Sequence, residues 1–337
     1  MRTRFCDILL RNPHVTQDFK EELKKAVIVE ATNVSDFYFS DPQEHWHFKD
    51  FPCTVPPFPL CWLDFTAPPI VSEEHGEIPW RRMNGGNAPE QWGFLCLSQK
   101  LAPEERLLYL QSTIWKKYPE LYFPHLGSLF WGVQLLLFFP EKGPEYLYWY
   151  FSYFLDEDGN IVMINEEDSL SLSVIMDPKL HDYLDRIEKL HGYEAMEKFK
   201  VQMYDGVCPF WHTALLAFSF MNCKNIELTE IFPEKVIPHN KAQKRRGEKP
   251  FQPLAYKVLN ISPLRKSSET IGAREAVVRA KMRGHFVRGH FATYTEEHKL
   301  FGKYTGRFYR PMHRRGSTGN IEKDYKIAPV QRPQVPE

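Results

Sequence analysis

The chain has 337 residues, of which 43% are apolar and 15% aromatic, with 43 basic and 43 acidic side chains. This composition excludes global disorder, and the length favours one large domain with a smaller one. The zero net charge hides an asymmetry, because residues 241–316 contain 19 Lys or Arg and 5 Asp or Glu, a local charge of +14 that leaves −14 elsewhere. Such an asymmetry indicates an anionic partner for the basic part.

Cysteine usage and hydropathy favour a cytoplasmic protein. The six cysteines are scattered without a Cys-x-x-Cys pair, as expected for reduced thiols. The start of the chain lacks the apolar core and cleavage site of a signal peptide. The most apolar run, residues 206–223, contains Pro209 and His212 and is too short to cross a bilayer comfortably, so we expect a buried helix and no membrane partner.

The first half of the chain predicts two helices and a short strand. Residues 15–28 combine an N-capping Thr16 with apolar residues at helical spacing, which predicts an amphipathic helix. A proline-rich stretch follows, within which residues 60–65 (LCWLDF) read as one short strand. Residues 102–120 place Pro103 in a first turn, acids after it and lysines near the end, which predicts a second helix.

The middle of the chain predicts the central sheet and two packed helices. Residues 128–139 and 145–164 are rich in aromatic and branched side chains, and the sequence DEDGN at 156–160 is typical of a hairpin turn. Residues 178–203 and 206–223 predict two helices joined at the Tyr-Asp-Gly sequence between them. The order strand, strand, helix, helix favours an α+β fold over a doubly wound sheet.

The sequence divides into four parts at shifts of composition. We expect an acidic, aromatic-rich α+β domain over residues 1–235, with an antiparallel sheet and packed helices. A basic, proline-bounded linker over 236–253 would connect it to a small basic β-rich module at 254–316. Residues 317–337 read as a loose tail.

A repeated triplet marks the basic module: Arg-Gly-His occurs at 283–285 and again at 288–290. In a strand, His285 and His290 would face opposite sides unless a bulge intervenes, and the glycines favour such a bulge. Arginine forks bind phosphate and aromatic rings stack on unpaired bases, so the segment predicts a nucleic-acid surface. The candidate residues are Arg283, His285, Arg288, His290, Phe291, Tyr294, Lys303, Arg307, Tyr309, His313, Arg314 and Arg315.

Three other interpretations of the module stay open at the level of sequence. Its aromatics would form a small core that the basic residues merely solvate, or its charge would bind an acidic protein in a non-catalytic structural role. Alternatively, His290, Tyr294, Arg307 and His313 supply the base, acid and cation types of a metal-independent ribonuclease of the toxin kind. We expect no metal and no cofactor, because the His-Trp-His sequence at 45–47 has no zinc-site spacing to nearby cysteines.

The segment from Arg283 to Gly316 resembles the closing signature of a large family found on phages, plasmids and other mobile elements. In that signature a histidine and an aromatic precede a Gly-containing loop, an aromatic strand and a basic-Gly ending. His290 with Phe291, Gly302 with Gly306, and Phe308 with Tyr309 match these steps in order. Phe291 and Tyr309 stand where many relatives have tryptophan.

The family includes type V-A anti-CRISPR proteins that act against production of the type V-A effector nuclease. The resemblance implies a regulator that is non-enzymatic or acts indirectly. It would recognise the nascent N-terminal peptide of the nuclease and lower the level of its message. In this interpretation the acidic domain holds the peptide and the basic module contacts messenger or ribosomal RNA.

Overall fold

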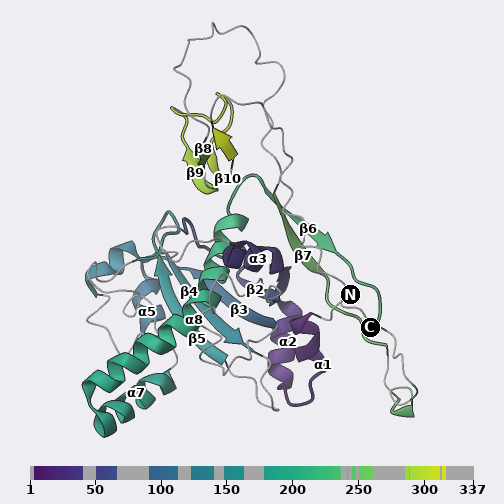
Figure 1. Cartoon of the computed structure of the whole chain (residues 1–337), viewed down its shortest axis with the longest axis vertical. Helices are drawn as coiled ribbons and strands as arrows, with labels where there is room; N and C mark the ends of the chain where they lie inside the picture. The colour runs from purple at the N-terminus through teal and green to yellow at the C-terminus, as the bar shows by residue number, and fades with distance from the viewer. Residues whose placement is uncertain are drawn as a thin grey trace, which may run out of the picture.

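The computed structural model describes residues 4–40, 51–66, 91–112, 123–139, 148–162, 178–236, 241, 245–247, 250–261, 285–287, 289–311 and 313–315. The helices are α1 (Phe5–Arg11), α2 (Gln17–Lys25), α3 (Thr32–Ser40), α5 (Glu105–Ser112), the 3-10 helix η4 (Phe123–Ser128), α7 (Pro178–His191) and α8 (Tyr193–Met221). The strands are β1 (Val27–Glu30), β2 (Leu60–Thr66), β3 (Gln91–Lys100), β4 (Trp131–Phe138), β5 (Tyr148–Leu155), β6 (Ile226–Ile231), β7 (Tyr256–Ile261), β8 (His285–Val287), β9 (His290–Tyr294), β10 (Gly306–Arg310) and β11 (His313–Arg315). The fold is α+β, as the sequence predicts (Figure 1).

A seven-stranded sheet runs through the molecule in the order β5-β4-β3-β2-β1-β7-β6. Strand β3 pairs antiparallel with β2 and with β4, and β6 pairs antiparallel with β7. The predicted antiparallel pairing in the middle region is that of β4 with β5. Strand β1 pairs parallel with both β2 and β7, so the sheet as a whole is mixed. Parallel neighbours need long connections, and chain segments of many residues separate β1 from both partners.

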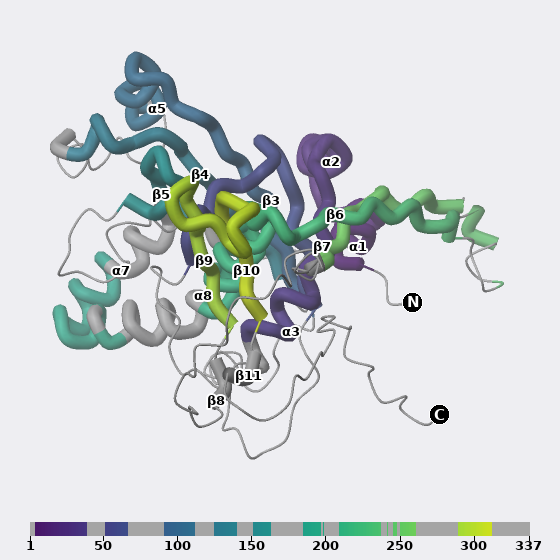
Figure 2. The backbone as a smooth tube through the Cα atoms, turned by 90° about the horizontal axis from the view of Figure 1, so that it is seen from above, coloured from purple at the N-terminus to yellow at the C-terminus, as the bar shows by residue number. Residues whose placement is uncertain are grey.

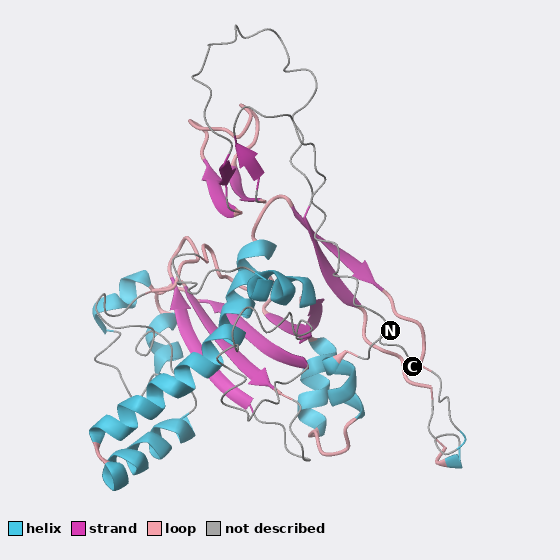
Figure 3. Ribbon diagram, viewed as in Figure 1, coloured by secondary structure: helices cyan, strands magenta, loops and turns pink. Residues whose placement is uncertain are grey.

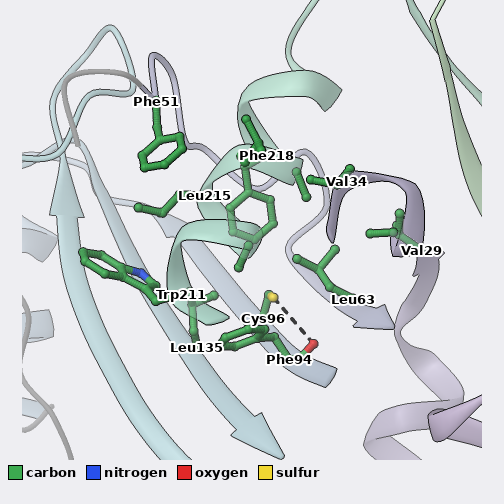
Figure 4. Close-up of a cluster of buried hydrophobic side chains, with 14 of the residues drawn as sticks. Val29, Val34, Phe51, Leu63, Phe94, Cys96, Leu135, Trp211, Leu215 and Phe218 are labelled. Atoms are coloured by element: carbon green, nitrogen blue, oxygen red, sulfur yellow. Dashed lines mark hydrogen bonds between the residues drawn. The ribbon is translucent and has the colours of Figure 1, made fainter. Parts of the chain in front are cut away.

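The two faces of the sheet are covered by different helices (Figure 3). On β2, Leu63 and Phe65 belong to the cluster built with α3 and α8, whereas Trp62 belongs to the cluster built with α1 and α2. This alternation follows from the two-residue period of a strand. Figure 4 shows the larger cluster, in which Trp211 and Phe218 of α8 lie over the sheet. Both faces are therefore buried, which accounts for the near-continuous apolar sequence of β2.

Close packing on the second face requires a glycine at position 93. A Cβ built on Gly93 would lie 2.1 Å from the Cζ2 atom of Trp62, a distance that no side chain accommodates. Trp62 also donates from its indole N–H to the buried carboxylate of Asp64, at 3.0 Å. The same carboxylate accepts from the backbone N–H groups of Phe5 (3.2 Å) and Cys6 (2.8 Å), which fastens α1 to the sheet. Burial raises the pKa of Asp64, and these donors oppose the shift.

Several local predictions are confirmed. Helix α2 begins after Thr16, whose hydroxyl accepts from the backbone N–H of Phe19. It ends at Lys25, so Val27 and Ile28 of the predicted helix lie in β1 instead. Residues 60–65 lie within β2, and the two aromatic stretches of the middle region form the antiparallel pair β4 and β5. The sequence DEDGN lies in a turn closed by an antiparallel bridge between Leu155 and Ile161.

The boundary between the last two helices differs from the prediction. The chain turns at Gly192, whose φ of 86° suits a glycine after a helix end, and not at the Tyr-Asp-Gly sequence. Helix α8 then continues through Pro209 to Met221. As predicted, its C-terminal half is buried, for example at Leu215 and Phe218. No helix in the described ranges is both long enough and apolar enough to cross a membrane.

The predicted linker is part of a β-hairpin instead. Strands β6 and β7 end their pairing with Ile231 opposite Tyr256. Farther along, Val236 and Phe251 form an antiparallel bridge. Both chains advance by the same number of residues between these two pairs, so the bridge continues the register of the strands. We call residues 226–261 the arm; it projects from the body in both Figure 1 and Figure 2. Strand β7, at the start of the predicted basic module, lies between β1 and β6 in the central sheet.

Candidate functional site

The segment with the repeated triplet forms a second antiparallel hairpin, residues 285–315, which we call the ribbon. Strands β9 and β10 pair with His290 opposite Arg310, and strands β8 and β11 pair with Val287 opposite His313. From one pair to the other, both chains advance by the same number of residues, so the two strand pairs share one register. Each histidine lies opposite an arginine, His285 opposite Arg315 and His290 opposite Arg310.

Two aromatic residues of the ribbon pack on the core. Phe291 and Tyr309 lie opposite each other across β9 and β10, with ring centroids 5.3 Å apart. Tyr309 also contacts Phe220 of α8 at 4.8 Å and Phe37 of α3 at 5.9 Å. Tyr309 is 4% exposed, so its predicted role as a base-stacking residue is not compatible with this structure. Its ring instead extends the core into the ribbon.

Hydrogen bonds from the residues just after α8 hold strand β10 in place. The side chain of Asn225 donates to the carbonyl of Tyr309 at 2.9 Å and accepts from the N–H of Tyr309 at 3.0 Å. The N–H of Lys224 donates to the carbonyl of Arg307 at 2.9 Å. Asn225 is buried, so these hydrogen bonds are shielded from water. The ribbon is thus fastened to the body by one side of β10.

The opposite face of the ribbon carries a small aromatic group of its own. Phe308 is buried between Tyr294 and Tyr304, with centroid distances of 6.0 and 6.3 Å. The guanidinium of Arg310 donates to the hydroxyl of Tyr294 at 3.1 Å. For Phe308, the interpretation that the aromatic residues form a small core is therefore correct.

The loop between β9 and β10 presents exposed aromatic rings and a cation. Leu300 and Tyr304 exchange both backbone hydrogen bonds, at 2.8 and 3.0 Å, and close a tight turn over Phe301, Gly302 and Lys303. Phe301 has a φ of 54° and is 40% exposed, and Tyr304 is 36% exposed. Positive φ is unfavourable for a residue with a Cβ, and such strain is concentrated at functional sites. The turn therefore fixes two rings beside Lys303 where an unpaired base can reach them.

Positive charge is not offset along the strands of the ribbon. No Asp or Glu occurs in residues 285–295 or 305–315. Arg307 and Arg310 are half-buried, and His290 and Lys303 are exposed. The neighbouring Cys223 does not neutralise Arg307, because burial raises the pKa of its thiol to about 12 despite the nearby guanidinium. Arg307 and Arg310 occupy alternate positions of β10, so an anion on either face of the ribbon meets an arginine fork and no competing carboxylate on the strands.

One further cation joins the site from outside the predicted module. The exposed side chain of Lys224 packs on Gly306, where a Cβ would lie 2.6 Å from its Cε atom. No sequence signal marks Lys224, because only the docking of the ribbon brings it there. Phe301 was likewise not among the predicted residues, although its position beside a Gly-Lys pair in an aromatic, basic segment was a usable signal.

The structure describes some of the remaining predicted residues and not others. Arg283 and Arg288 lie outside the described residues. His285, His313, Arg314 and Arg315 belong to β8 and β11, where their backbone pairing is defined.

The predicted ribonuclease constellation is divided by the ribbon. Tyr294 and His290 lie on the same face of the ribbon as Arg310. Arg307 lies on the other face, with the core-facing Tyr309. Alternate positions of a strand face opposite sides, so the candidate base and the phosphate-binding Arg307 do not converge on one point. Within the described ranges, no three His, Cys, Asp or Glu side chains gather as a metal site, and the sequence at 45–47 lies outside these ranges.

Comparisons of this chain with protein-family models, with curated proteins and with solved structures found no match.

Proposed function

We propose that this protein is a regulatory RNA-binding protein of a mobile element, and that the ribbon is its RNA-contacting surface. The observation that supports this most strongly is a ribbon whose strands carry arginines and no acidic residue, joined by a tight turn that exposes Phe301 and Tyr304. Single-stranded RNA is bound by this combination, because cations follow the phosphates while aromatic rings stack on the bases. The fixed attachment through Asn225 and Tyr309 reduces the entropy lost on binding.

The proposed action follows the type V-A anti-CRISPR proteins that the closing segment resembles. In this proposal the acidic part of the chain binds the basic N-terminal peptide of the type V-A effector nuclease as it emerges from the ribosome. The ribbon binds the attached message or the ribosomal RNA, and the level of the message falls. The charge of −14 outside residues 241–316 supports a basic peptide as the first partner.

RNA binding is tested with an unpaired fluorescent oligonucleotide over a series of salt concentrations. Replacing Lys303, Arg307 and Arg310 by Gln should weaken binding at least tenfold and reduce the slope of log K against log[salt] by about 2, since single strands give roughly 0.7 per phosphate contact. The matched control replaces three exposed cations of the α7–α8 hairpin, Arg186, Lys189 and Lys198, by Gln. Equal behaviour of the two triple variants, with unchanged melting temperatures, would refute the assignment of the ribbon.

Copurification from cells separates the regulatory proposal from its rivals. Crosslinked RNA and copurified peptides are sequenced in parallel, and we expect nuclease message together with the nuclease N-terminal peptide. Metal-independent cleavage of RNA that is lost in His290→Ala would support the ribonuclease instead, because a general base acts on the transition state more than on affinity. Recovery of neither RNA nor peptide would favour a purely structural interaction protein.

A further inference from the structure

The arm carries its positive charge at one end. The tip, residues 237–250, contains five Lys or Arg and one Glu. The stem on either side of it, residues 226–236 and 251–261, contains three Glu and two Lys. One of those lysines, Lys257, lies 3.7 Å from the carboxylate of Glu230. A polyanion is therefore attracted to the far end of the arm and not to its length.

Contacts at the base of the arm fix its direction. The guanidinium of Arg4 donates to the carbonyl of Leu254 at 2.6 Å and lies over the ring of Tyr256 at 4.2 Å. The guanidinium of Arg11 lies 4.2 Å from the ring centroid of Phe251. Val236 and Phe251 exchange backbone hydrogen bonds of 2.8 and 3.0 Å, which carries the strand pairing outward from the sheet. Helix α1 thus supports the stem, which projects from the body (Figure 2).

The described residues of the tip are fully available to a ligand. Lys241, Arg245 and Arg246 are all exposed. The tip sequence, IPHNKAQKRRGEKP, contains no Phe, Tyr or Trp. Stacking on unpaired bases needs an aromatic ring, so the tip is suited to phosphates alone. In this respect it differs from the ribbon, whose turn exposes Phe301 and Tyr304.

We propose that the arm is a second RNA contact, which places its basic tip against the phosphates of a double-stranded RNA groove. A duplex offers two rows of phosphates to a narrow basic projection, and it is recognised by shape and backbone contacts instead of base stacking. This inference rests on the proposed function, because it assumes that RNA is the partner. It adds that the arm selects paired RNA while the ribbon selects unpaired RNA.

The test compares an RNA hairpin with an unpaired oligonucleotide of similar length. The hairpin has roughly 16 base pairs, which is the span that double-stranded RNA-binding domains cover. The arm variant replaces Lys241, Arg245 and Arg246 by Gln, and the control is the triple replacement in α7 and α8. We expect the arm variant to bind the duplex at least tenfold more weakly, with a salt slope lower by roughly 2 to 3, since duplex contacts contribute about 0.9 each. Its affinity for the unpaired probe should stay within about twofold of the wild type.

Duplex binding that survives in the arm variant, or an equal loss on both probes, would overturn the inference. The ribbon variant, with Lys303, Arg307 and Arg310 replaced, separates this failure from a failure of the proposed function. If the ribbon variant alone loses RNA, the proposed function stands and the arm is only structural. If the wild-type protein binds neither probe, the proposed function and the inference both fail.

Discussion

The arm and the ribbon are both antiparallel hairpins, but they are attached to the body in different ways. In the ribbon, Tyr309 and Phe291 extend the hydrophobic core, and Asn225 fastens the backbone. In the arm, β6 and β7 are strands of the central sheet, and the chain beyond them leaves the body. The ribbon is attached to the body through β9 and β10, whereas the arm is attached through β6 and β7 at its base.

This difference teaches how one basic region can hold two surfaces. The ribbon packs one face on the body, and this packing fixes the positions of its cations and its turn relative to the body. An arm anchored at its root extends a charged tip beyond the body at the cost of few core contacts. The predictions below concern stability, because the two modes of attachment should respond differently to mutation.

The largest effect is expected from Tyr309→Ala. Removing a buried ring that contacts Phe37, Phe220 and Phe291 leaves a cavity, so the free energy of unfolding should fall by about 3–5 kcal/mol. Tyr304→Ala removes an exposed ring of the same type and should cost less than about 1 kcal/mol. Urea denaturation measures both. Equal losses would show that the ribbon is not part of the core.

Asn225→Ala should have the next largest effect. The substitution leaves the N–H and the carbonyl of Tyr309 without their partner in a buried site, which costs about 2–4 kcal/mol at roughly 1–2 kcal/mol per group. Hydrogen exchange should show faster exchange of the Tyr309 amide. The control is Asn260→Ala on the arm, which removes one exposed hydrogen bond to Thr229 and should cost less than about 1 kcal/mol. Unchanged protection of Tyr309 would contradict the anchoring role.

The smallest effect, and the one specific to the root of the arm, concerns Glu30. Strand β1 places Glu30 between Asp64 of β2 and Val258 of β7. Burial raises the pKa of Glu30, and repulsion from Asp64 adds to this, while the hydrogen bond from the Thr32 N–H opposes it. A raised pKa means that the folded state holds the proton more tightly than the unfolded state, so the ionised carboxylate destabilises the fold.

Glu30→Gln keeps the acceptor for Thr32 and removes the charge. It should therefore raise the free energy of unfolding at neutral pH, and the gain should vanish as the pH falls below the ordinary glutamate value of 4.5. The control is Glu227→Gln, at an exposed position of β6. Denaturation midpoints at several pH values measure the difference. A gain that persists at low pH would mean that ionisation of Glu30 is not its cause.

The sequence predicted the elements whose signals are local. The cap at Thr16, the strand at 60–65 and the turn at 156–160 each depend on neighbouring residues, and all three are present. The α+β class followed from the order of these elements.

Local sequence signals did not reveal the features that depend on distant residues. The prolines around residues 233–253 suggested a linker, but pairing between Val236 and Phe251 and the insertion of β7 beside β1 depend on contacts far apart in the chain. In the candidate site, the repeated triplet drew attention to the segment that forms the ribbon, and its binding role stays a prediction. The burial of Tyr309 and the approach of Lys224 could not be predicted, because both result from docking on α8.

The most direct test of the central claim is ultraviolet crosslinking of the intact protein to an unpaired RNA, with the crosslinked residues identified by mass spectrometry. The account predicts crosslinks at the exposed rings of Phe301 and Tyr304, and their loss when Lys303, Arg307 and Arg310 are replaced by Gln. Crosslinks concentrated on α7 and α8, or RNA binding without any crosslink in residues 285–315, would contradict it.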